Sequence, residues 1–343
     1  MATGPAGSRA PTLSTVAAAA GVSRQTVSNA LNNPELLRPD TLARVRAVID
    51  ELGYTPNRAA RQLRTRTSRL IGLRVDGPGD TADNASMDRF LHALVEAMAR
   101  TDHHLLLFSG DPRDPLDGYE DLLRSTAVDA FVVTDTYAGT PQAPFLQERG
   151  APFVTFGRPW ELPDADWAWV DIDGAAGLHA ATEHLLAVGH DQIAWLGWDR
   201  GSRLSEDRRS GWESALVGAG GDPEGRTARI GADDVDAARR AAHAQLDAGA
   251  TAFACAGDTL GIGVLHALAE RGLRPGVDVG VVGFEDSLAA QLAWPGLSSV
   301  RPPVEDVAAE LVSLIHRVLA GDPLGERGTM LTPSLVIRRS SSR

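Results

Sequence analysis

Four polar side chains near the start of the chain have types and spacing that could recognise nucleic-acid bases: Arg24, Gln25, Ser28 and Asn29. An arginine can donate two hydrogen bonds to guanine, and glutamine or asparagine can pair with adenine in the same two-point way, while serine suits phosphate oxygens. The apolar positions 27, 30 and 31 have the i, i+3, i+4 spacing of one helix face. The segment 24–31 therefore predicts a helix with one packed face and, opposite it, a polar face.

The flanking segments predict two further helices that would position this one. Thr12 is a suitable helix cap before residues 13–20, and Gly21 ends that helix. A third helix begins near Pro39, a residue suited to a first helical turn, and ends at Gly53. Two short helices joined by a turn that contains glycine are typical of a helix-turn-helix, whose second helix enters the major groove of DNA. The alternative is an ordinary three-helix bundle whose polar residues are only solvated.

Charge is distributed unevenly along the chain. The net charge of −12, taken as a whole, would argue against a polyanionic partner. Residues 1–70, however, contain ten arginines and four acidic residues, a charge of +6, so that the other 273 residues carry −18. Such asymmetry favours a basic module that binds nucleic acid, attached to an acidic body.

Several motifs of the N-terminal segment resemble the lactose/galactose-repressor (LacI) family. They are AGVS at 20–23, QTVSNALN at 25–32 and PNRAARQL at 56–63, with shorter matches at 16–17, 44–45 and 49–54, and the resemblance continues to Val336. One departure is Arg38 ahead of Pro39, where the family usually has a serine or threonine cap, and it should weaken the third helix slightly. The resemblance implies a transcriptional regulator that binds double-stranded operator DNA as a homodimer. Of the two modes of regulation, repression is the one expected.

The same resemblance implies roles for individual residues. Those expected to read bases are Arg24, Gln25 and Asn29, and those expected to contact phosphates are Ser23, Thr26 and Ser28.

Residues 57–63 match the family's hinge helix, so DNA contacts are also expected from Asn57, Arg58 and Leu63. A helix of about seven residues is unstable alone in water, so this one would order only on the operator. Leu63 would then wedge between base pairs in the minor groove. The alternative is that Leu63 packs on the following domain.

After residue 69, apolar strands alternate with helical stretches. Strands are expected at 70–75, 105–109, 130–134, 153–156, 193–197, 252–256 and 279–284, and helices at 87–100, 175–188, 207–217, 235–246, 260–271 and 304–319. This alternation predicts an α/β fold with doubly wound parallel sheets, and about 270 residues favour two lobes over one sheet. The resemblance likewise implies a core similar to periplasmic sugar-binding proteins, with a ligand cleft between two lobes.

The expected domain organisation has four parts. They are a flexible tail at 1–11, a helix-turn-helix domain at 12–56, a hinge helix and linker at 57–68, and an effector-binding and dimerisation domain at 69–343. Within the last part, lobe 1 is expected at about 69–171 and 302–326, and lobe 2 at about 172–301 and 327–343.

Candidate effector contacts lie at the carboxyl ends of strands, where open α/β sheets bind ligands. They are Arg158, Asp173, Arg208 and Asp258, of which Arg208 and Asp258 also match ligand positions of the family. Charged groups that hydrogen-bond hydroxyls suit a sugar, a related polyol or a nucleoside, and a sugar or related polyol is the expected effector. The alternative for each is a helix cap or a surface ion pair. The family often has an aromatic residue near 231–234, which is absent here, while Trp160, Trp167 and Trp169 could face a sugar or pack in a core.

Motifs and composition argue against other classes. No Gly-x-Gly-x-x-Gly follows a strand, and a Walker loop is impossible without lysine, so we expect neither an enzyme nor a cofactor. The histidines lack metal-ligand spacing, and the single cysteine, Cys255, excludes an internal disulfide. The rival class is a solute-binding protein that delivers sugar to a transporter. Residues 1–11 lack the apolar region of a secretory signal, so a cytoplasmic protein associated with the nucleoid is expected instead.

Overall fold

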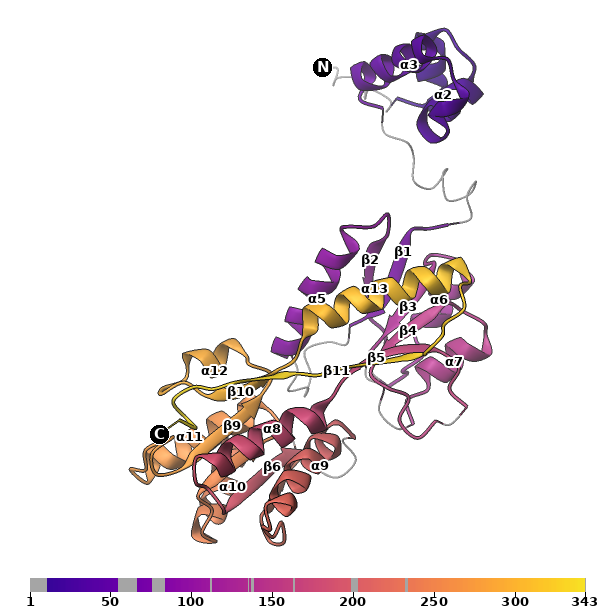
Figure 1. Cartoon of the computed structure of the whole chain (residues 1–343). Helices are drawn as coiled ribbons and strands as arrows, with labels where there is room; N and C mark the ends of the chain where they lie inside the picture. Colours follow the sequence, from indigo (N-terminus) through magenta and orange to yellow (C-terminus); the bar gives the residue numbers. More distant parts are fainter. Residues whose placement is uncertain are drawn as a thin grey trace, which may run out of the picture. The chain divides into compact units, whose positions relative to one another are not determined.

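The computed structural model describes residues 11–54, 67–75, 84–111, 113–134, 136, 139–162, 164–198, 203–231 and 234–342. The chain divides into two compact units, Met1–Ser68 and Arg69–Arg343 (Figure 1). The hinge residues named above, Asn57, Arg58 and Leu63, lie outside the described residues.

The first unit, over residues 11–54, is helical. Its elements are α1 (Leu13–Ala20), α2 (Arg24–Asn32), the 3-10 turn η1 (Pro34–Leu36) and α3 (Pro39–Leu52). Thr12 and Thr15 cap α1 reciprocally, and Gly21 ends it in the left-handed conformation. Buried side chains from all three α-helices, among them Val16, Val27 and Val45, form one core. The predicted helix-turn-helix is confirmed.

Lobe 1 of the second unit contains a parallel sheet with the strand order β11-β5-β4-β3-β1-β2. Its strands are β1 (Leu70–Arg74), β2 (His104–Phe108), β3 (Ala130–Val133), β4 (Phe153–Phe156), β5 (Ala168–Ile172) and β11 (Gly328–Leu331). Its helices are α5 (Asn84–Met98), α6 (Tyr119–Arg124), α7 (Gln142–Glu148) and α13 (Val304–Ala320). α5 and α13 lie side by side, and α13 packs on the middle strands (Figure 1).

Lobe 2 contains a second sheet, with the order β12-β10-β9-β8-β6-β7. Its strands are β6 (Ile193–Trp198), β7 (Thr227–Ile230), β8 (Ala252–Cys255), β9 (Gly280–Phe284), β10 (Ser298–Arg301) and β12 (Ser334–Val336). Its helices are α8 (Gly174–Ala187), α9 (Arg203–Gly218), α10 (Val235–Asp247), α11 (Asp258–Glu270) and α12 (Leu288–Leu292). The pairing is parallel except that β12 runs antiparallel to β10 at the edge.

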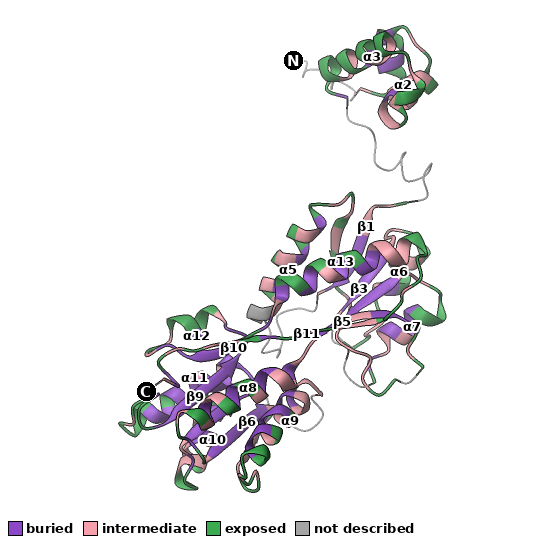
Figure 2. Ribbon diagram, in the orientation of Figure 1, coloured by how far each residue is buried: buried purple, intermediate pink, exposed green. Residues whose placement is uncertain are grey.

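Helices cover both faces of a parallel sheet of this kind, so its central strands are buried on both sides. All four residues of β3 are buried (Figure 2), and so are all four residues of β8. Cys255, in β8, is fully buried as a small core residue of the apolar cluster in lobe 2. The predicted fold class, a helix-turn-helix head with two parallel α/β lobes, is confirmed.

The position of the last crossing between the lobes differs from the prediction. The described chain passes between lobes after β5, after β10 and after β11. Residues from 327 onward were expected in lobe 2, yet β11 pairs with β5 in the sheet of lobe 1. This register depends on Gly328, because a Cβ there would lie only 2.0 Å from the ring of Trp169. The last crossing therefore follows Leu331.

Candidate functional site

The polar face of α2 is presented by the helix as the sequence predicts. The Ser23 hydroxyl accepts a hydrogen bond from the backbone N–H of Thr26 at 3.1 Å and so caps the first turn. Val27 is buried in the core of the unit, whereas Arg24 and Gln25 are exposed. The candidate base-reading side chains therefore project from the side of the helix that does not pack.

Two of those side chains contact each other. The Gln25 Nε2 donates to Oδ1 of Asn29 at 3.0 Å, a contact between residues one turn apart. Along the same face, Nδ2 of Asn32 donates to the carbonyl of Ser28 at 2.6 Å. Each side-chain amide has further donor and acceptor capacity, so this arrangement orients the pair and leaves groups for a base edge.

A pocket lies between the two lobes at the carboxyl ends of their strands, the expected place for a ligand in such sheets. Its cavity volume is about 110 Å³. A single water needs about 10–15 Å³, so the cavity can hold a small organic molecule. The residues that line it are Met87, Phe90, Phe156, Asp171, Ile172, Gly174, Leu204, Arg208, Phe284, Glu285, Pro302 and Val304. Mostly apolar walls with a few charged groups are typical of small-molecule sites.

Arg208 is one of the predicted effector residues and lines this pocket. It lies on α9 and is 6% exposed. Its Nη1 donates to the carbonyl of Ala256, just after β8, and lies 3.8 Å from Oε1 of Glu285. The ring of Phe284 lies 3.8 Å from the guanidinium carbon. The guanidinium is therefore held in place and contributes a positive charge on a rigid support.

Arg158 links carboxylates that belong to different lobes. Its Nε donates to Oδ2 of Asp171 on β5, and its Nη2 lies 3.3 Å from Oδ2 of Asp207 on α9. Asp207 directly precedes Arg208, and successive helical residues point in directions about 100° apart, so the two reach different partners. Burial raises the pKa of Asp207, as do the nearby charges of Asp171 and Asp173, while Arg158 opposes the rise.

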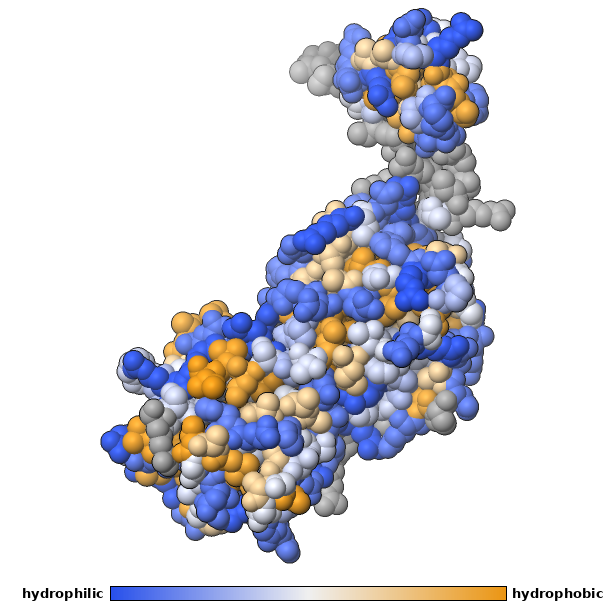
Figure 3. Space-filling model, viewed as in Figure 1, coloured by the Kyte–Doolittle hydropathy of each residue, from blue (hydrophilic) through white to orange (hydrophobic). Residues whose placement is uncertain are grey.

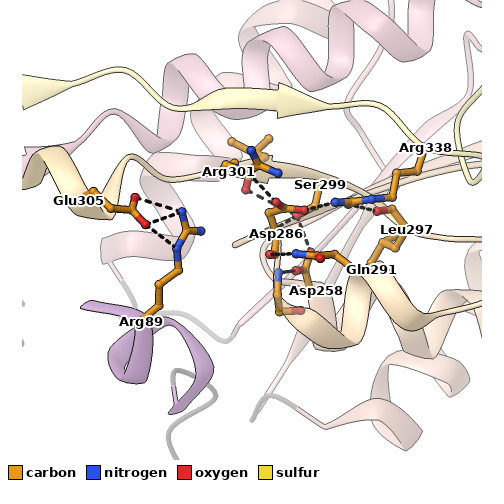
Figure 4. Close-up of polar contacts among 11 residues, drawn as sticks. Arg89, Asp258, Asp286, Gln291, Leu297, Ser299, Arg301, Glu305 and Arg338 are labelled. Carbon is orange, nitrogen blue, oxygen red and sulfur yellow. Dashed lines mark hydrogen bonds and ion pairs between the residues drawn. The ribbon is translucent and has the colours of Figure 1, made fainter. Parts of the chain in front are cut away.

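The other two predicted effector residues, Asp173 and Asp258, have partners inside lobe 2. Asp173 caps α8, where its Oδ1 accepts from the backbone N–H of Ala176 at 2.8 Å. Asp258 accepts from the Ser299 hydroxyl at 2.6 Å and from the backbone N–H of Ser287 at 2.7 Å (Figure 4). Burial raises the pKa of Asp258 to about 6. The pocket-lining set among the described residues includes neither carboxylate.

Three charged residues of this region were missed from the sequence: Asp171, Asp207 and Glu285. Glu285 directly follows β9, so the strand-end argument that selected Arg158 could have found it. Its backbone φ is 108° and that of Asp286 is 50°, both uncommon for residues with a side chain. The turn sends Glu285 into the pocket and Asp286 to two arginines, Arg301 and Arg338 (Figure 4).

The tryptophans that could have faced a sugar have other neighbours. The Trp160 ring lies 4.2 Å from the Arg158 guanidinium carbon, Trp167 is buried against Phe153, and Trp169 lies over Gly328. The aromatic rings that line the pocket are those of Phe90, Phe156 and Phe284.

The fold and these two sites define a class of two-domain protein, in which a helix-turn-helix unit with a polar recognition face is joined to a two-lobed α/β domain with a pocket between its lobes.

Membrane-spanning helices and metal clusters are a separate question. Within the described ranges, none of the helices has the length and apolar character needed to cross a bilayer. Those same residues include no group of three potential ligands arranged to hold a metal ion.

Both units are similar to known proteins. Residues 12–57 match the family described as bacterial regulatory proteins, lacI family, and residues 182–341 match the periplasmic binding protein-like domain. The transcriptional regulator CelR of Thermobifida fusca is 32% identical over 341 residues, which cover 97% of this chain and 98% of CelR. GalR of Escherichia coli is 29% identical over 96% of each chain. The chain belongs to the LacI family.

Solved structures agree with this membership. A LacI-family regulatory protein from Chloroflexus aggregans superposes with a TM-score of 0.75 and 34% identity, over 80% of this chain and 99% of that protein. A complex of the regulator CelR with cellobiose superposes with a TM-score of 0.72 and 28% identity, over 96% of this chain and 99% of that one. This protein is therefore a DNA-binding transcriptional regulator and not an enzyme.

Proposed function

We propose that the protein is a repressor that binds a specific operator as a homodimer in the cytoplasm, under the control of a sugar or related polyol. The observation that carries the proposal is the pocket, whose walls come from both lobes, with the Arg158–Asp207 ion pair joining the lobes beside it. A ligand that contacts both lobes changes the free energy of their closure, which is the property that a control site requires. The cellobiose complex of the relative CelR supports a sugar.

On the DNA side, we assign base reading to Arg24, Gln25 and Asn29. Phosphate contacts are assigned to Ser23, Thr26 and Ser28. The support is that all six belong to α2 or its N-cap and that each is exposed or half-buried, whereas Val27 is buried. Asn57, Arg58 and Leu63 keep their assignment as hinge contacts on the sequence match alone.

On the effector side, Arg208 is the residue assigned to direct contact with the ligand. Arg158 is assigned to the link between lobes. Asp173 and Asp258 are assigned to holding the pocket wall, because each accepts hydrogen bonds from groups that surround it.

The homodimer has a candidate contact surface on α12 and the turn that follows it. Leu288, Leu292 and Trp294 are 67%, 75% and 85% exposed, and Figure 3 shows apolar surface in this region. Large apolar patches on the surface of a protein commonly mark sites of interaction with a partner. Sedimentation of the Leu292→Glu variant tests it: the variant should be monomeric, whereas an unchanged dimer would place the interface elsewhere.

The proposed function is tested in two steps with the full chain. Operator sequences are selected from randomised DNA, and their binding is measured at several salt concentrations, where affinity should fall steeply with salt because phosphate neutralisation releases counterions. Thermal shifts are then recorded with cellobiose, maltose, galactose and adenosine. A compound that raises the melting temperature should also change operator affinity. Stabilisation by a sugar without any change in operator affinity would contradict control by this pocket.

A further inference from the structure

The pocket carries more negative than positive groups. Two carboxylates, Asp171 and Glu285, line it directly, and Asp207 and Asp173 lie at the same junction between the lobes. The guanidinium groups in this cluster are those of Arg208 and Arg158. When all six groups are ionised, the four carboxylates and the two guanidinium groups together carry a net charge of −2.

The two guanidinium groups are already engaged with protein acceptors. Arg158 contacts both Asp171 and Asp207 through different nitrogens. The Nη1 of Arg208 donates to the Ala256 carbonyl and faces Glu285, while the ring of Phe284 lies against the guanidinium. An anionic ligand would have to compete with these acceptors for Nη1 of Arg208 and for Nε and Nη2 of Arg158.

The remaining walls suit a ligand without charge. Met87, Phe90, Phe156, Phe284 and Val304 supply apolar surface. A cyclic polyol has C–H faces that can pack on aromatic rings, and hydroxyl groups that can donate to carboxylates. Carboxylate acceptors in a mostly apolar pocket therefore match hydroxyl donors, and they repel phosphate or carboxylate in surroundings where charge is poorly screened.

We infer that the pocket selects uncharged polyols and excludes their phosphorylated or carboxylated forms, with Glu285 as a specificity-determining residue. This inference rests on the proposed function in one respect, namely that the effector occupies this pocket. It goes further by naming the charge class of the ligand, and with it the class of reaction that must supply that ligand: hydrolysis or uptake that leaves the sugar unphosphorylated.

The test uses matched ligands with the full chain at constant ionic strength. Calorimetry is run with cellobiose, galactose and glucose, and with glucose 6-phosphate and glucuronate as anionic counterparts of glucose. A neutral sugar should bind, and each anionic form should bind at least about tenfold more weakly than its neutral counterpart. An anionic sugar that binds as tightly as the neutral one overturns the inference.

Two variants connect the selectivity to Glu285. In Glu285→Gln the ratio of neutral to anionic affinity should shrink several-fold. Glu96→Gln removes the same charge from an exposed position on α5, where Glu96 pairs with Arg100, and should leave the ratio unchanged. An unchanged ratio in Glu285→Gln would remove this residue from the selectivity.

A third measurement separates the inference from the proposed function. Thermal unfolding is compared in inorganic phosphate and in chloride of equal ionic strength. Specific stabilisation by phosphate that disappears in Arg208→Met would show that the pocket takes anions and would overturn the inference. Absence of binding by every sugar, together with absence of phosphate stabilisation, would reject the sugar effector while leaving the exclusion of anions supported.

Discussion

The recognition face of α2 and the pocket between the lobes are built in opposite ways. The face of α2 is contiguous in sequence, from Arg24 to Asn29, and its polar side chains lie at the surface of a small helical unit. The pocket draws on residues from Met87 to Val304, and its charged groups are largely buried in ion pairs. In α2, one face of the helix is the recognition face and another face packs in the core. In the pocket, the same side chains contribute to recognition and to stability.

This difference predicts different consequences of mutation. A substitution on the exposed face of α2 should change what is recognised and leave the unfolding free energy nearly unaltered. A substitution at a buried charge in the pocket leaves its partner without compensation, so it should lower stability and recognition together.

The largest effect is expected from Arg208→Met. The substitution leaves the Glu285 carboxylate and the Ala256 carbonyl without the guanidinium, which should cost about 3–5 kcal/mol of unfolding free energy. Response to the effector should also disappear, while operator affinity in its absence stays nearly intact. Urea unfolding and mobility shift measure the two effects.

The matched control for that variant is the next residue in α9. Arg209 is 25% exposed and pairs with Glu206 and Glu213 on the same lobe. Arg209→Met should cost about 0–1 kcal/mol, as partly exposed ion pairs usually do. Equal losses for the two variants would contradict the distinction between a pocket arginine and a surface one.

The second effect concerns the pH dependence of stability at Asp258. Burial raises the pKa of this carboxyl from 3.8 to about 6, so the folded protein holds its proton more tightly than the unfolded chain. Its stabilising contribution is therefore fully present below about pH 4 and is lost as pH rises through 6. Relative to Asp258→Asn, the wild type should lose up to about 3 kcal/mol between pH 4 and 7, measured by urea unfolding.

Asp278 provides the opposite case and serves as the control for Asp258. The hydrogen bond from the Arg274 side chain lowers the pKa of this exposed carboxyl to about 2, so its contribution is present above the ordinary pKa and is lost only in strong acid. The difference between wild type and Asp278→Asn should therefore stay flat from pH 4 to 7. The attribution of the Asp258 effect to burial would be contradicted by either of two results. One is a difference between wild type and Asp278→Asn that changes between pH 4 and 7, and the other is a difference between wild type and Asp258→Asn that does not.

On the face of α2, Gln25→Ala should change base preference rather than stability. Loss of one two-point amide contact should cost about 1–3 kcal/mol of discrimination at particular operator positions. Ser28→Ala, by contrast, should weaken binding to all sequences alike. Binding selections on randomised DNA distinguish the two variants, and an unaltered preference in Gln25→Ala would remove its role in base reading.

The smallest effect is expected at the start of α3. Arg38 occupies the capping position there, and its side chain makes no capping hydrogen bond. Arg38→Ser should supply one and stabilise the first unit by about 0.5–1 kcal/mol. Amide exchange in residues 39–52 detects the gain, and slower exchange confined to the first turn is the expected pattern. A loss of stability would mean that the arginine contributes in another way.

Much of the fold could be predicted because its signals are local. The helices at 13–20 and 24–31 and their caps follow from spacing within one or two turns, and the fully apolar strands such as β3 follow from composition. The elements missed were the short helices α6, α7 and α12 and the strands at or next to a sheet edge, namely β5, β7, β10, β11 and β12. Their few residues carry little periodicity, and partners distant in sequence decide their pairing.

The residues of the candidate site likewise divide into those with a local sequence signal and those that meet only in the tertiary structure. Arg208 could be named because its neighbours in α9 match a family motif, and the six residues of the α2 region because they share one short helix and its cap. Asp171, Asp207 and Glu285 could not be recognised as one cluster, because they meet only when the lobes face each other. Asp258 shows the converse, since a residue at a strand end turned out to have its hydrogen-bond partners within lobe 2.

By itself, then, the sequence determined the helix-turn-helix, its polar face, the α/β alternation and the charge asymmetry between the two units. Helical and strand periodicity, capping and net charge are properties of neighbouring residues or of simple sums, so they need no three-dimensional partner. Only the tertiary structure decided that β11 joins the sheet of lobe 1 and that Arg158 reaches Asp207. These contacts join residues separated by tens to more than a hundred positions, and their geometry depends on how whole sheets twist and pack.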